Sequence, residues 1–108
     1  MAIPTVADLA RFVRERLTEV SDTLAPLWSR RDTPEVLPPR GREHPDSSVL
    51  ATARQLAMVI VGAAAPFATT SYSRARLIRQ MHASGLLSDE HAVRTQRLLE
   101  LVRDAPPR

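Results

Sequence analysis

Residues 56–65 read Leu-Ala-Met-Val-Ile-Val-Gly-Ala-Ala-Ala, and this stretch decides the fold. It contains no polar side chain and is followed by Pro66, which cannot continue a helix because it lacks a backbone donor. The stretch lies within an expected helix over about 46–65, which Asp46 or Ser47 can cap. A helix that is apolar on every side is normally central in its fold. We therefore expect this helix to form the centre of a helical core.

A chain of this length offers few elements with which to surround such a helix. The 108 residues correspond to one domain, 1–108, and a domain of this size buries only a modest core. A second subunit could therefore cover part of the apolar helix, and the small residues over 62–65 would let a neighbouring backbone approach closely. In the alternative interpretation, the other helices of the same chain enclose it completely.

An earlier helix is expected over about 5–28, with Thr5 as its N-cap and Asp8 in the acidic position three residues later. Its apolar residues follow one another in alternating steps of four and three: Val6, Ala10, Val13, Leu17, Val20, Leu24 and Leu27. This 3.5-residue repeat is typical of helices that pair with other helices, within a bundle or between chains. Pro26 is expected to end or kink the helix, because its ring clashes with the preceding turn.

The stretch over about 29–45 is rich in proline and arginine. Sequence of this kind buries little apolar surface, so we expect an extended linker between the two helices. A partner-binding arm is the alternative interpretation.

A helical hairpin is expected over about 70–103. Gly85 stands where the left-handed residue that ends a helix belongs, and Leu86 can make the accompanying apolar contact. Ser88 can cap the next helix, and Asp89 and Glu90 then lie favourably at its positive end. The expected fold is thus all-α, a small helical bundle of about four helices with a Pro-rich linker after the first.

The composition agrees with a helical core and offers few of the residue patterns that catalytic sites require. Aromatic residues make up only 4% of the chain, and there are three glycines and no cysteine. The histidines lack a partner at helical spacing, Glu15 and Glu19 lie on the polar side of the first helix, and no glycine-rich phosphate loop is present. We therefore predict no enzymatic activity and no catalytic, cofactor-binding or metal site.

The charge and the apolar runs bear on location and partners. The longest apolar run, 56–66, is too short to span a bilayer, and no basic segment followed by an apolar one opens the chain. A cytoplasmic protein without a membrane partner is therefore expected. All fifteen basic residues other than histidine are Arg, and the net charge is +3. No acidic residue occurs over 47–88, so a weakly acidic partner could bind to that stretch.

These observations favour a protein–protein interaction module, a homodimer or an adaptor for another protein. The expected contacts are the apolar residues of the first two helices: Val13, Leu17, Val20, Leu24, Leu56, Ile60 and Val61.

The alternative is a small DNA-binding regulator that uses the hairpin over 70–103. Its possible nucleic-acid contacts are Tyr72, Arg74, Arg76 and Arg79. Arg and Tyr on one helix can contact phosphates and stack on bases, and a short turn with Gly85 is compatible with a helix-turn-helix. Against this, Asp89 and Glu90 open the helix that would enter the groove, and they would repel the DNA backbone.

Overall fold

The computed structural model describes residues 5–29 and 47–103, which form five helices and no strand. The helices are α1 (Val6–Glu19), α2 (Ala25–Ser29), α3 (Ser47–Ala64), α4 (Ser71–Ala83) and α5 (Asp89–Glu100). The predicted all-α bundle is therefore confirmed. The linker expected over 29–45 lies outside the described residues, apart from its first residue.

Three of the long helices begin at a hydroxyl cap, because the first N–H groups of a helix have no partner within it. The Thr5 hydroxyl accepts from the backbone N–H of Asp8 at 3.1 Å, and the Thr70 hydroxyl accepts from that of Ser73 at the same distance. The Ser88 hydroxyl accepts from the backbone N–H of His91, also at 3.1 Å. The expected starts of the first helix and of the hairpin's second helix are thus confirmed.

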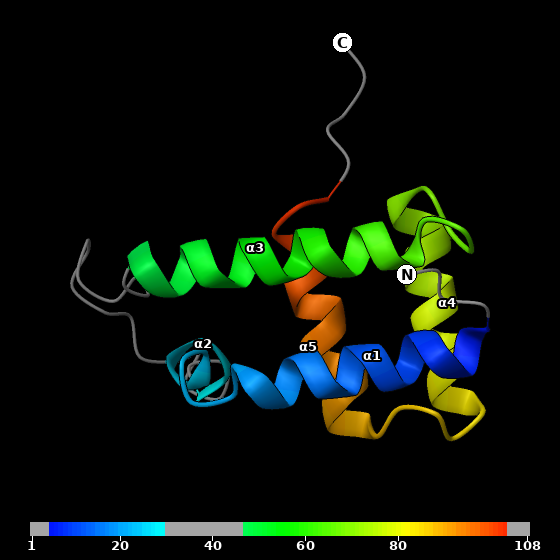
Figure 1. The fold of residues 1–108 in the computed structure, drawn as a ribbon, viewed down its shortest axis with the longest axis horizontal. Coiled ribbons are helices and arrows are strands. Elements are labelled where there is room, and N and C mark those ends of the chain that lie inside the picture. The colour runs from blue at the N-terminus through cyan, green and yellow to red at the C-terminus, as the bar shows by residue number, and fades with distance from the viewer. Residues whose placement is uncertain (1–4, 30–46, 104–108) are drawn as a thin grey trace, which may run out of the picture.

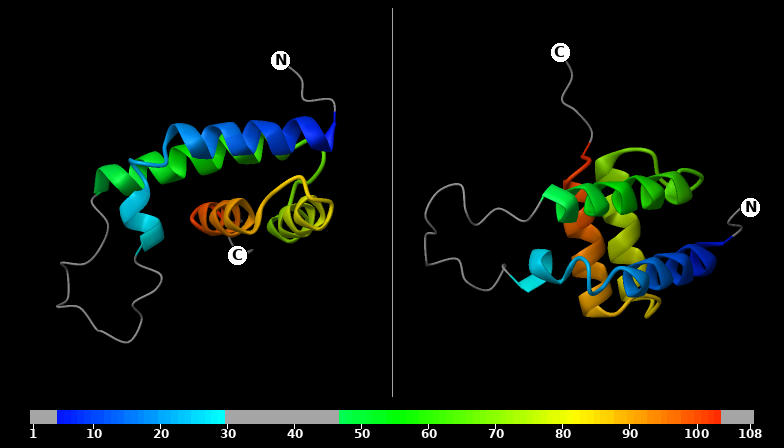
Figure 2. Two further views of the ribbon diagram at one scale, coloured as in Figure 1. Left: turned by 90° about the horizontal axis from the view of Figure 1, so that it is seen from below. Right: turned by 60° about the vertical axis from the view of Figure 1, so that its left-hand side comes forward.

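The helices form two layers. Figure 1 shows α1 and α3 side by side, with α4 and α5 running across them. The view from below in Figure 2 places α1 and α3 in one layer and the α4–α5 hairpin in the other, with α2 beside them at one end. Helix α3 packs against α1 and α5, and α1 also contacts α4.

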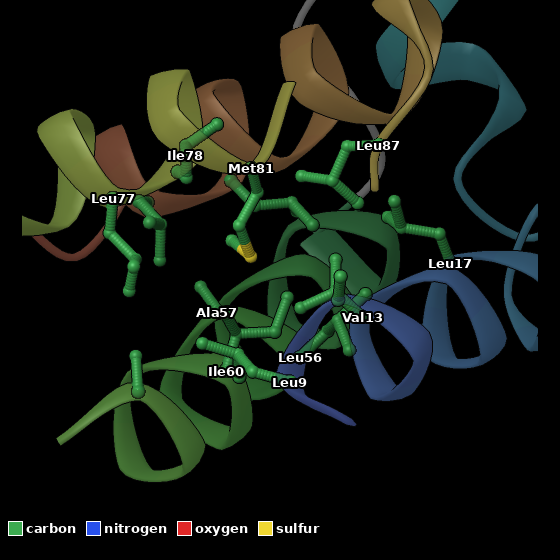
Figure 3. Packing of buried hydrophobic residues seen from close by; sticks show 14 of the residues in the cluster. Leu9, Val13, Leu17, Leu56, Ala57, Ile60, Leu77, Ile78, Met81 and Leu87 are labelled. Atoms are coloured by element: carbon green, nitrogen blue, oxygen red, sulfur yellow. The ribbon is translucent and has the colours of Figure 1, made fainter. Parts of the chain in front are cut away.

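The core lies between the two layers and is built from aliphatic side chains, as the scarcity of aromatic residues requires. Figure 3 shows Leu9, Val13 and Leu17 of α1 facing the inner side chains of α3, with Leu77, Ile78 and Met81 of α4 and Leu87 of the turn closing over them. The inner residues of α3 are Val49, Ala53, Leu56, Ala57, Ile60 and Ala64, all buried. Full burial of one such large side chain contributes about 1.5–3 kcal/mol.

The continuous helix expected over 5–28 is wrong, since α1 ends at Glu19 and α2 begins only at Ala25. Four of the five residues between them, Val20 to Thr23, are short polar or β-branched ones, which favour a helix weakly, and the fifth is the buried Leu24. Pro26 does not end the first helix. It lies in the first turn of α2, where a missing N–H costs nothing.

The turn after α4 has the predicted geometry. Gly85 has a φ of 80°, its N–H donates to the carbonyl of His82 at 3.0 Å, and the N–H of Leu86 donates to that of Met81 at 2.9 Å. These two bonds define a Schellman motif, which the positive φ of glycine makes possible. The Arg14 guanidinium donates to the Leu86 carbonyl at 2.6 Å, which ties α1 to the turn.

Candidate interaction surfaces

The seven residues predicted to contact a partner lie mostly in the core of their own chain. Val13, Leu17, Leu24, Leu56 and Ile60 are at most 7% exposed, while Val20 and Val61 are half-buried and pack against the same core. The 3.5-residue repeat of the first helix is therefore used inside the bundle. A partner that docks on the folded chain would have to displace part of the core to reach these side chains.

The opposite side of α3 carries an exposed stripe, of which the sequence analysis names only the small residues over 62–65. Its members follow one another in steps of four and three, and we call them the α3 seam: Ala51, Gln55, Met58, Gly62 and Ala65. Met58 is 57% exposed, and the adjacent Val59 is 46% exposed. The helix that is apolar on every side thus buries one side and leaves the other to solvent.

Two further properties distinguish the α3 seam. Arg54 is the only ionisable residue of α3; it is exposed one turn before Met58, so the seam residues carry no charge but have one cation along their edge. A Cβ atom added at Gly62 would meet no atom within 4 Å, so nothing inside the chain requires a glycine there. Glycine in a helix interior costs about 0.5–1 kcal/mol relative to alanine, and this cost has no compensation within the monomer.

The four residues predicted as possible nucleic-acid contacts divide into two groups. Tyr72 is 71% exposed, and Arg76 and Arg79 are also exposed on α4. Arg74 is only 4% exposed, and its guanidinium donates to the Thr69 carbonyl at 3.1 Å, so it does not present its charge to a ligand on the surface. Its position three, four and seven residues before Leu77, Ile78 and Met81 places it on the inner side of α4.

The start of α5 is acidic and exposed. The side chain of Asp89 is 93% exposed and its carboxylate lies 2.5 Å from Nε2 of His82 on α4. Glu90 forms an ion pair with Arg94 at 2.6 Å. The guanidinium of Arg94 also lies over the ring of Trp28, 5.2 Å from its centroid, and this contact fastens α2 to α5.

A groove of about 580 Å³ runs between α4 and α5 on the surface. We call it the hairpin groove, and its lining consists of Ile78, Arg79, His82, Asp89, Ala92, Val93, Gln96, Arg97 and Glu100. Within the described ranges, neither Arg79 nor Arg97 forms an ion pair. Of this lining, the sequence reasoning had named only Arg79 as a contact.

The part of the chain that the structure describes offers neither a metal cluster nor a membrane-spanning helix. No group of three or more His, Asp or Glu side chains there is placed to hold a metal ion. No helix in the same residues is long and apolar enough to cross a membrane.

Comparison of the chain with models of protein families, with curated proteins and with solved structures finds no match.

Proposed function

We propose that the protein is a non-enzymatic interaction module of the cytoplasm that pairs with a second copy of itself through the α3 seam. The observation that carries the proposal is the exposed, uncharged stripe of mostly small residues centred on Met58, with the exposed Val59 beside it. Two such stripes can face one another so that each Met58 side chain lies against the small residues of the other copy.

A second copy fits this seam better than a charged partner does. In a two-fold dimer the same patch meets itself, so a charged patch would place like charges opposite one another. The seam has no charge, and Gly62 and the two alanines allow two backbones to approach closely. The exposed part of Met58, more than half of the side chain, would then be removed from water.

The test is the mass of the full chain in solution at micromolar concentration, measured by sedimentation equilibrium. Burial of the exposed part of Met58 on both copies contributes about 2–3 kcal/mol, so Met58→Asp should weaken the dimer by at least roughly 30-fold. Val93→Asp is the matched control, because Val93 is 49% exposed on α5, away from the seam. A parent protein that stays monomeric, or a Met58→Asp variant that dimerises as the parent does, would exclude self-pairing through α3. The module would then be an adaptor for a different protein.

DNA binding remains the second candidate, and the exposure of Tyr72, Arg76 and Arg79 on one helix supports it. The exposed acids at the start of α5 act against it, because that end of the helix would meet the phosphates. If DNA binds, replacing Arg76 with Gln should weaken retention on duplex DNA and flatten its salt dependence. A wild-type chain that is not retained at low salt would remove this candidate.

A further inference from the structure

The hairpin groove combines an apolar floor with two arginines that form no ion pair among the described residues. Ile78 is 4% exposed and Ala92 is half-buried, while Val93 stands at the rim with 49% of its surface exposed. Arg79 is exposed on α4 and Arg97 is half-buried on α5. The groove therefore offers apolar contact and guanidinium groups side by side.

Arg79 and Arg97 belong to the groove lining, and two other arginines of the hairpin are already engaged. Arg94 is paired with Glu90, and Arg74 donates to a backbone carbonyl. Neither Arg79 nor Arg97 has an acceptor among the described residues, and the Nε atom of Arg97 is buried without one. A guanidinium binds a carboxylate with two parallel hydrogen bonds, which are stronger than neutral ones.

The acids of the groove limit what can occupy it. Asp89 begins α5 and Glu100 ends it, so the groove has a carboxylate near each end of that helix. A long polyanion such as DNA would carry its phosphates past both of these carboxylates. A short segment whose own carboxylates are central, and whose ends are neutral or basic, would meet opposite charges along its whole length.

We propose that the hairpin groove binds an amphipathic helix of a partner protein whose carboxylates pair with Arg79 and Arg97. Apolar side chains of that helix lie on the floor formed by Ile78 and Ala92 and against Val93. This is the helix-in-groove mode, in which anchors at intervals of three and four residues face the groove. The groove belongs to the α4–α5 layer, so this binding is separate from pairing through α3.

The probe is a synthetic helical peptide with a leucine stripe, two central glutamates one turn apart and lysines at both ends. It is titrated into the full chain labelled with ¹⁵N, and the amide shifts of α4 and α5 are followed. The expected result is saturable shifts confined to residues that line the groove. A peptide with glutamine in place of both glutamates should bind about ten-fold more weakly or worse, because it lacks the charge-assisted bonds.

Variants of the protein test the same pairing from the other side. Arg79→Gln and Arg97→Gln should each weaken binding of the glutamate peptide by about ten-fold and leave binding of the glutamine peptide unchanged. Arg76→Gln is the matched control, because Arg76 is exposed on α4 but does not line the groove. The monomeric Met58→Asp variant should bind the peptide as the parent does, so failure of self-pairing and failure of groove binding can be told apart.

Three results would overturn the proposal. The first is equal affinity for the two peptides, and the second is shifts located outside α4 and α5. The third is a short DNA duplex that produces the same groove shifts and displaces the peptide, which would assign the groove to nucleic acid.

Discussion

Ile60 and Met58 lie two residues apart on α3 and face opposite ways. Replacing each of them separately with Asp therefore tests which side of α3 faces the core. Ile60 is 2% exposed and belongs to the core, whereas Met58 is 57% exposed on the α3 seam. We predict that Ile60→Asp unfolds the chain. We expect that Met58→Asp leaves it folded and affects only self-pairing.

The expected cost at Ile60 follows from its burial. Truncating a buried isoleucine costs about 2–5 kcal/mol, and burying an unpaired carboxylate adds several more. Arg74 is the only buried charged side chain among the described residues, and its guanidinium is already bound to the Thr69 carbonyl. A domain of this size has only about 5–15 kcal/mol of unfolding free energy, so little or none would remain.

The assay is thermal unfolding followed by circular dichroism, with Ile60→Val as the conservative control. Ile60→Val removes one methyl group and should cost about 0.5–1.5 kcal/mol, which lowers the Tm by several degrees. The reasoning would be refuted if Ile60→Asp melted within a few degrees of the parent. The inner side of α3 would then not be the core.

Two further predictions concern glycines. Gly85→Ala should lower the unfolding free energy by about 1 kcal/mol, because a φ of 80° strains any residue with a Cβ atom. Calorimetry should then show a Tm that is lower by roughly 4–8 °C. An unchanged Tm would contradict the role given to Gly85 in the turn. Gly62→Ala, introduced into the monomeric Met58→Asp variant, should raise the unfolding free energy by about 0.5–1 kcal/mol. Introduced into the parent, it should weaken the dimer, and a tighter dimer in sedimentation would show that the seam is not closely packed.

Local chemistry in the sequence predicted much of the fold. The caps at Thr5 and Ser88 and the left-handed Gly85 depend on bonds between residues a few positions apart, so they can be read from neighbouring residues alone. The break between α1 and α2 does not follow from the sequence pattern, because Pro26 is expected there to end or kink a helix that is already in progress. Proline is equally favourable in the first turn of a new one.

The surfaces were harder to predict than the helices, because exposure depends on how whole helices pack. The apolar periodicity of the first helix indicated pairing but could not show whether its partner was in the same chain. The uniformly apolar residues of α3 hid which side would face the core, and so hid the exposure of Met58, although the small residues over 62–65 already indicated a close approach. The burial of Arg74 could have been predicted from the sequence, because its spacing of three and seven residues from Leu77 and Met81 places it on the inner side of α4.

The hydrogen bond from Arg14 to the Leu86 carbonyl has a consequence for how the chain folds as it is made. Helix α1 is synthesised before α4 and α5, which it contacts. At about 5–20 residues per second, the 72 positions between Arg14 and Leu86 take about 4–14 s to translate. During that interval Leu9, Val13 and Leu17 have no finished core to enter. The inner side of α1 therefore stays partly exposed until the α4–α5 hairpin has been made.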